Sequence, residues 1–254
     1  MEIQFLGTSG HGITLDRNSV SVLIDQQILI DCGEGCTKTL YEQHIPLNKL
    51  KAVFISHIHS DHVIGLVSLL CQLSYYDHAL PELPIYMPVG MKSRFESVLE
   101  QLYYAYVPHI FKFSIIELPL ICTSPLKLEF DKKSYDIDWI QSRHHPICYA
   151  FRFNNSVVLS GDSSPHPMIG TFAQNCDLLI HEGTFPDGMG EVAHKVNHST
   201  PSEIAQLAAE NHVKRLIFYH VPDLAHKDEE SYLAQSRKIH SKVSVAHDLD
   251  RIQI

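Results

Sequence analysis

The chain has 254 residues, and its 44% hydrophobic and 19% charged content excludes a disordered or fibrous protein. A net charge of −9, from 20 Lys and Arg against 29 Asp and Glu, argues against a protein that coats nucleic acids without sequence preference. Apolar runs are far shorter than the roughly 18 residues of a membrane span, and the first ten residues lack a signal-peptide pattern. We therefore expect a cytoplasmic protein without membrane contact, of one large domain or two small ones.

Strands and helices are predicted along the whole chain. The hydrophobic pattern predicts strands at 3–6, 20–24, 27–31, 52–56, 137–140, 149–153, 157–160, 178–180 and 216–219. Helices are predicted at 36–43, 62–73, 91–105, 201–211 and 229–240. Because the two kinds of element are mixed, sheets covered by helices are expected.

The segment 74–113 contains six of the 11 tyrosines of the chain and several prolines. One interpretation is an aromatic helix packed on the core. The alternative is a cleft wall or the contact face of a homodimer, since Tyr is favoured where one side of a residue stays wet.

The 18 histidines are unusually many, and several potential metal ligands directly follow predicted strands. These residues are Asp31, His57, Asp162, His181 and His220. In layered α/β folds, ligand sites collect where strands end and loops converge. Five residues of this type in the same position indicate a metal site.

The strongest motif is the run from Ser56 to His62, SHIHSDH. Residues two apart in an extended segment face the same way, so His57 and His59 can bind one ion. Asp61 and His62 come where the chain turns into a helix and can face a second ion alongside. Imidazole and carboxylate donors suit Zn²⁺ best, with Mn²⁺ or Fe²⁺ as alternatives.

Four residues cannot fill the coordination shells of two ions, so other segments must contribute. Asp162 follows Gly161 at a strand end, where its carboxylate can bridge two ions. His220 is a further candidate. Either His144 or His145 supplies another ligand.

The run HIHSDH resembles the HxHxDH signature of the metallo-β-lactamase superfamily, and the motifs LIDCGEG, GD and a late His follow in the order of that superfamily. The opening FLGTSGHG, the HEGT of 181–184 and the HST of 198–200 resemble ribonuclease Z and its relatives. The resemblance covers most of the chain. It implies one hydrolase domain over 1–254, an α/β fold with an αββα sandwich of two mixed sheets flanked by helices.

The resemblance also implies a ligand set for two Zn²⁺ ions. The first ion would be bound by His57, His59 and His144, and the second by Asp61, His62 and His220. Asp162 would bridge the two ions. His144 is favoured over His145 because the family places this His seven residues before an aromatic residue, here Phe151. Asp31 would orient a ligand imidazole.

In this family the reaction is hydrolysis of a phosphodiester by a metal-bound hydroxide. Asp61 would orient the attacking water or accept its proton. Glu182 of HEGT and His198 of HST would assist the leaving group, while His181 is interpreted as structural.

The long arm of ribonuclease Z, which grips the tRNA elbow, has no counterpart, because only 18 residues separate His144 from Asp162. We expect a phosphodiester substrate, either an RNA end or a small cyclic or linear phosphodiester. The missing arm argues against tRNA 3′-end processing and makes a small phosphodiester such as a cyclic nucleotide the first alternative. A thioester or lactone hydrolase on the same fold is the second alternative.

Overall fold

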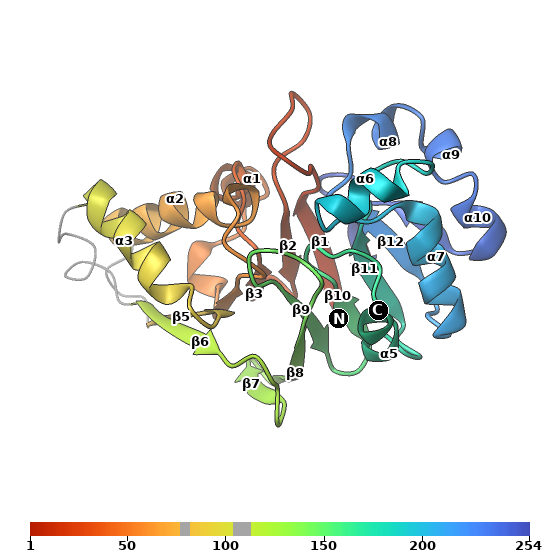
Figure 1. Ribbon diagram of the computed structural model, residues 1–254. Coiled ribbons are helices and arrows are strands. Elements are labelled where there is room, and N and C mark those ends of the chain that lie inside the picture. The colour runs from red at the N-terminus through yellow and green to blue at the C-terminus, as the bar shows by residue number, and fades with distance from the viewer. Residues whose placement is uncertain (77–81, 104–112) are drawn as a thin grey trace. The chain divides into compact units, whose positions relative to one another are not determined.

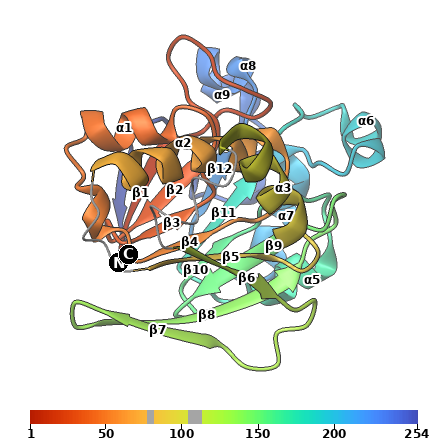
Figure 2. The same cartoon turned by 90° about the vertical axis from the view of Figure 1, so that its left-hand side faces the viewer.

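The computed structural model describes residues 1–76, 82–103 and 113–254 (Figures 1 and 2). The chain forms two compact units. The first consists of Met1–Gly7, His11–Pro119 and Asp248–Gln253, and the second of Thr8–Gly10, Leu120–His247 and Ile254. Each unit is built on one sheet, which has seven strands within the described residues.

The sheet of the first unit has the strand order β14-β1-β2-β3-β4-β5-β6. These strands are β14 (Arg251–Gln253), β1 (Glu2–Gly7), β2 (Ser21–Ile24), β3 (Ile28–Ile30), β4 (Ala52–Phe54), β5 (Leu83–Pro88) and β6 (Phe113–Leu118). The pairs β14–β1, β1–β2 and β2–β3 are antiparallel, and β3 to β6 run parallel to one another. The described helices are α1 (Cys36–Glu42), the 3-10 turn η1 (Leu47–Lys49), α2 (Ser60–Tyr76) and α3 (Lys92–Tyr103).

The sheet of the second unit has the order β13-β12-β11-β10-β9-β8-β7. These strands are β13 (Val243–Val245), β12 (Leu216–Tyr219), β11 (Leu178–Glu182), β10 (Val157–Leu159), β9 (Tyr149–Phe153), β8 (Lys133–Gln141) and β7 (Leu126–Phe130). Strands β10 to β13 are parallel, and β7 to β10 are antiparallel. The described helices are α5 (Pro167–Phe172), α6 (Gly190–Lys195), α7 (Pro201–Glu210), α8 (Asp223–Lys227), α9 (Glu229–Tyr232) and α10 (Ser236–Ile239).

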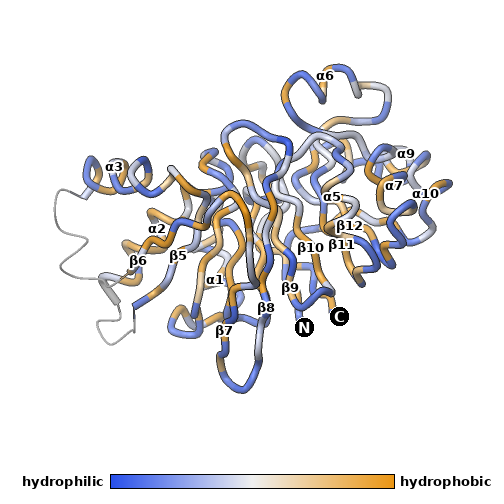
Figure 3. Tube along the Cα trace, turned by 60° about the horizontal axis from the view of Figure 1, so that its bottom comes forward, coloured by the Kyte–Doolittle hydropathy of each residue, from blue (hydrophilic) through white to orange (hydrophobic). Residues whose placement is uncertain are grey.

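Burial explains the sequence pattern of the strands. The central strands β3, β4, β10 and β12 are buried along their whole length, so their sequences are continuous apolar runs. The outer hairpin of β7 and β8 instead alternates between more and less buried residues. Its hydrophilic turn at Asp131 and Lys132, where both residues have positive φ, is visible in Figure 3. Such a two-residue turn matches the twist of the flanking strands.

Helix α7 shows how local sequence fixes a helix start near the HST motif. Glu203 accepts hydrogen bonds from the backbone N–H of Thr200 (3.2 Å) and from its hydroxyl (2.7 Å), and Pro201 takes the first helical position. Ile204 and Ala208 pack into the core of the second unit. The backbone is therefore fixed directly after His198.

Most predicted elements are present, with two main differences. The helix predicted over 229–240 is wrong, because the chain forms the short helices α9 and α10 instead. The tyrosine-rich segment also contains a strand that was not predicted, β5, whose Tyr86 stacks on Phe54 with ring centroids 4.6 Å apart, whereas α3 matches the helix predicted from residue 91. The end of the helix predicted over 91–105 lies outside the described residues.

Candidate metal centre

Three strand ends have a residue with positive φ, a conformation that L-residues rarely adopt and glycine adopts freely. Asp31 follows β3 with φ 54°, His220 follows β12 with φ 50°, and Gly161, two residues after β10, has φ 58°. Left-handed conformations at Asp and His cost energy and tend to occur where function requires a particular side-chain direction. Asp31, Asp162 and His220 are therefore held at their strand ends by unusual turns.

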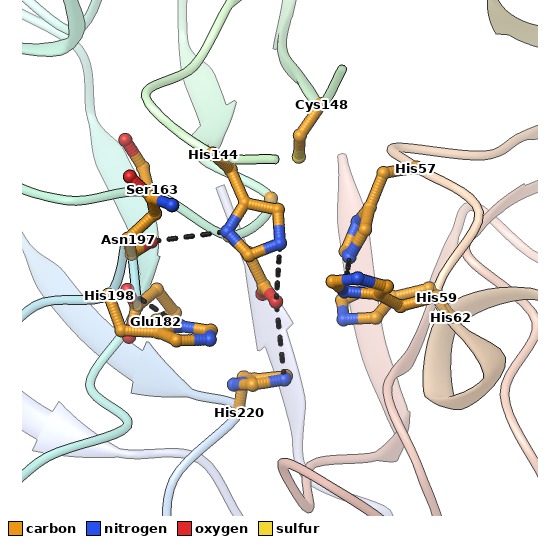
Figure 4. A network of polar contacts seen from close by, with 12 residues as sticks. His57, His59, His62, His144, Cys148, Ser163, Glu182, Asn197, His198 and His220 are labelled. Atoms are coloured by element: carbon orange, nitrogen blue, oxygen red, sulfur yellow. Dashed lines mark hydrogen bonds and ion pairs between the residues drawn. The ribbon is translucent and has the colours of Figure 1, made fainter. Parts of the chain in front are cut away.

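The SHIHSDH motif forms a cluster in the first unit, between β4 and the first turn of α2. His57 and His62 are buried and their ring centroids lie 4.1 Å apart, while His59 is exposed. Nε2 of His57 lies 2.9 Å from Nδ1 of His59. The structure thus brings the three imidazoles together, as Figure 4 shows.

Asp31 and Ser56 anchor this cluster from behind. Nδ1 of His62 donates to Oδ2 of Asp31 at 2.8 Å. Asp31 also accepts the backbone N–H of Ser56 (2.7 Å) and its hydroxyl (2.8 Å). Since the only proton of that hydroxyl goes to Asp31, the hydroxyl accepts from Nδ1 of His57, 3.1 Å away. Both buried imidazoles therefore use Nδ1 for protein contacts. The sequence pattern did not indicate that Ser56 would contact Asp31 and His57.

Asp61 lies in the first turn of α2, and its Oδ2 accepts the backbone N–H of His11 at 3.1 Å. The same oxygen is 3.8 Å from Nε2 of His62. The contact with His11 gives a role to the opening FLGTSGHG, which the sequence indicated only as a family resemblance. Backbone donors such as this one leave no residue-type signal.

Two glycines allow the LIDCGEG loop to approach α2. A Cβ at Gly33 would lie 2.3 Å from the carbonyl oxygen of Asp61, and a Cβ at Gly65 would lie 2.0 Å from that of Gly33. The N–H of Cys32 donates to the carbonyl of His62 at 2.8 Å. Only glycine fits this contact, which places Asp31 beside His62.

In the second unit, Asp162 lies between two imidazoles. Its Oδ2 is 3.9 Å from Nε2 of His144 and 3.6 Å from Nε2 of His220. Nδ1 of His144 donates to the carbonyl of Asn197 at 3.1 Å (Figure 4). His145 is exposed, so His144 is the histidine of this pair that lies beside Asp162. Asn197 was not singled out from the sequence.

Glu182 and His198 form a buried pair, which Thr184 links to His220. Nδ1 of His198 donates to Oε1 of Glu182 at 3.3 Å. The N–H and the hydroxyl of Thr184 donate to Oε2 of Glu182 at 2.8 and 2.7 Å. The same hydroxyl lies 2.8 Å from Nδ1 of His220. Glu182, His198 and His220 also offer donor atoms close enough to hold a metal ion.

The electrostatics of this pair favour an ionised carboxylate. Burial raises the pKa of the Glu182 carboxyl, but the hydrogen bond and charge of His198, with the charge of His181, outweigh it and lower the pKa below its ordinary value. Burial also lowers the pKa of His181, whose Nδ1 contacts the carbonyl of Glu182 at 2.8 Å. The ionised carboxylate of Glu182 can therefore accept the hydrogen bond from Nδ1–H of His198 at neutral pH.

The donor geometry within each unit fits histidine metal ligands. Metal-bound His typically donates its second ring N–H to a carboxylate, carbonyl or hydroxyl of the protein. In His62, His144 and His220, Nδ1 has such a partner in Asp31, Asn197 and Thr184, respectively. Nitrogen and oxygen donors of this kind suit Zn²⁺, and also Mn²⁺ or Fe²⁺.

The segment between His144 and Asp162 contains only the strands β9 and β10. It holds no inserted arm. Within the described residues, no helix is long and apolar enough to cross a membrane.

Comparisons with known proteins agree with this structure. The family model described as anti-Pycsar protein Apyc1 matches residues 1–240. Ribonuclease Z of Methanosarcina mazei is 28% identical, with 100% of this chain and 98% of the relative covered. Ribonuclease BN of Proteus mirabilis is 26% identical, with both chains fully covered.

Solved structures show the fold. The short form of human tRNase Z has a TM-score of 0.78 at 24% identity, covering 100% of this chain and 99% of the other. The metallo-β-lactamase fold protein YhfI of Bacillus subtilis has a TM-score of 0.79 at 23% identity, covering 99% and 98%. The predicted fold and the resemblance to ribonuclease Z are confirmed. The chain belongs to the family of the anti-Pycsar protein Apyc1, and it has the metallo-β-lactamase fold.

Proposed function

We propose that this chain is a metal-dependent hydrolase of phosphodiester bonds that uses two metal ions. Family membership, ribonuclease Z and BN relatives and the donor chemistry of each cluster support this. In the proposed ligand set, His57, His59 and His144 would hold one ion, Asp61, His62 and His220 would hold a second, and Asp162 would contribute its carboxylate. Two Zn²⁺ ions are proposed, with Mn²⁺ or Fe²⁺ as alternatives.

Two divalent ions bound there would supply a nucleophile at neutral pH and neutralise charge on the phosphoryl oxygens. Asp61 is proposed to orient the attacking water and accept its proton. Its carboxylate is held by the N–H of His11, which fixes the direction of Oδ2. The left-handed turn at His220 and the bond from Nδ1 of His62 to Asp31 hold two of the ligands before substrate arrives.

The buried pair of Glu182 and His198 is the observation that favours a phosphodiester as the bond that is cleaved. The carboxylate accepts a hydrogen bond from Nδ1 of His198. The other ring nitrogen, Nε2, is therefore the one available to protonate a leaving oxygen. A phosphodiester with an alkoxide leaving group needs such a proton. Acyl transfer makes less use of a leaving-group acid at this position, so a thioester or lactone substrate is the weaker alternative.

Small phosphodiesters are the substrates that we favour, with cyclic nucleotides first and short RNA ends second. The chain lacks an inserted arm between His144 and Asp162, and its net charge is −9. A long nucleic acid would need many cationic contacts to offset its phosphates. One small substrate needs only the site itself.

The test is a side-by-side assay of the untagged enzyme on bis(p-nitrophenyl) phosphate, cyclic nucleotides, a pre-tRNA and a thioester. We expect turnover of the phosphodiesters, with the largest kcat/KM on a cyclic nucleotide, and at least two metal ions per chain. Asp61→Ala should abolish turnover with the fold retained. Faster thioester hydrolysis, or full activity in metal-free folded protein, would contradict the proposal. A homodimer and a cytoplasmic location remain predictions, and light scattering during gel filtration tests the first.

A further inference from the structure

A second pair of histidines lies among residues that the proposed hydrolase does not use. His226 is in α8, and His247 comes two residues after β13. Their Nδ1 atoms are 3.0 Å apart, and the rings are nearly perpendicular (88°) with centroids 4.5 Å apart. Both residues belong to the second unit. The Nδ1 atoms of His226 and His247 therefore face each other at close range.

The separation of the two nitrogens fits a shared metal ion. Two nitrogens bound at 2.0–2.1 Å to a tetrahedral ion lie roughly 3.3 Å apart, close to the distance observed here. Without an ion, one neutral imidazole can donate a single hydrogen bond to the other, and protonation of both rings makes them repel. Imidazole is a preferred donor for Zn²⁺, Ni²⁺ and Cu²⁺.

Glu229 adds the outer group that histidine ligands usually have. Its Oε2 lies 3.5 Å from Nε2 of His247, the nitrogen that does not face His226. Its Oε1 is held by Nη2 of Arg237 at 2.6 Å, so the carboxylate has a fixed direction. A carboxylate behind a ligand imidazole fixes the ring and raises its basicity.

We propose that His226 and His247 form an additional binding site for a divalent transition-metal ion, with Glu229 as a positioning residue. The ion would bind both Nδ1 atoms, and water would complete its coordination, since the side chain of His247 is 50% exposed. The site joins α8 to the end of β13, where the N–H of Ala246 donates to the carbonyl of Phe218 at 2.8 Å. Because α8 begins three residues after His220, a bound ion would restrain the chain that follows this proposed ligand.

The test compares metal content in untagged protein dialysed against Zn²⁺. Wild type should hold one ion per chain more than His226→Gln or His247→Gln, and both variants should keep phosphodiester hydrolysis. His212→Asn, which removes an exposed histidine outside the pair, should keep the extra ion. Equal content in wild type and a folded variant of the pair overturns the site, and hydrolysis is measured separately, so failure of the proposed function is distinguishable.

A second measurement uses Cu²⁺ as a probe. The electron paramagnetic resonance spectrum of wild type loaded with Cu²⁺ after the dialysis should show coupling to two imidazole nitrogens. The spectra of His226→Gln and His247→Gln should lack this coupling. Glu229→Gln should weaken binding at this site about tenfold or more. Arg237→Gln, which removes only the partner of Glu229, should leave the two-nitrogen spectrum intact. A wild-type spectrum identical to that of the variants overturns the assignment.

Discussion

The hydroxyl of Thr184 joins His220 to the carboxylate of Glu182, at 2.8 Å from Nδ1 of the first and 2.7 Å from Oε2 of the second. A hydroxyl has one proton, and an ionised carboxylate can only accept. Because the pKa of Glu182 is lowered, the proton of Thr184 goes to Glu182. Nδ1 of His220 must then donate to Thr184, which leaves the lone pair of His220 on Nε2, the nitrogen 3.6 Å from Asp162.

Thr184→Val should therefore weaken the metal site although no proposed ligand changes. Valine keeps the shape but cannot accept from His220, so the tautomer with a lone pair on Nε2 is no longer favoured. Loss of such an outer partner typically costs about 10–100-fold in metal affinity. Competition with a chelator measures the change, and Thr184→Ser, which keeps the hydroxyl, should restore most of the affinity. Equal metal affinity in the valine variant and wild type would show that Thr184 does not set the tautomer.

His198→Ala should slow substrates with poor leaving groups far more than those with good ones. An alkoxide needs a proton in the transition state, whereas p-nitrophenolate leaves without one. General acid catalysis typically contributes about 10²–10⁴-fold, so a loss of this size is expected on a cyclic nucleotide and a much smaller one on bis(p-nitrophenyl) phosphate. The slope of log kcat against leaving-group pKa measures the effect. The same loss on both substrates would exclude an acid role.

The sequence predicted the central strands and the strand-end residues because buried strands leave continuous apolar runs. Strands 149–153 and 216–219 have the predicted bounds. The helix predicted over 229–240 is interrupted at 233–235, where the N–H of Ala234 bonds to the carbonyl of Ser231 only three residues back, a local turn that the periodic pattern does not contain. Ser56 and Thr184 were missed as partners because a hydroxyl that hydrogen-bonds an imidazole follows no spacing rule.

Asp31→Asn tests the support of the first cluster. The amide keeps the size of the side chain. It replaces the negative carboxylate that accepts hydrogen bonds from Nδ1 of His62 and from the backbone N–H of Ser56 with a neutral group. We expect about 10–100-fold weaker metal binding. Asp25→Asn is a matched control, since Asp25 also has a positive φ (50°) in the same unit and accepts a backbone N–H, that of Glu2. Similar metal affinity in the two variants would argue against the role of Asp31.

The pH dependence of stability tests the charge of Glu182. Its folded pKa lies below the ordinary value of 4.5, so the ionised carboxylate stabilises the fold above that pH, and the stabilisation is lost as pH falls through the lower, folded pKa. Glu182→Gln removes this titration. Urea unfolding between pH 7 and pH 4 should show wild type more stable than the variant at neutral pH, with the difference narrowing below pH 4.5. A difference that widens toward acid would mean that the folded protein holds Glu182 protonated, and Thr184 would then not have to accept from His220.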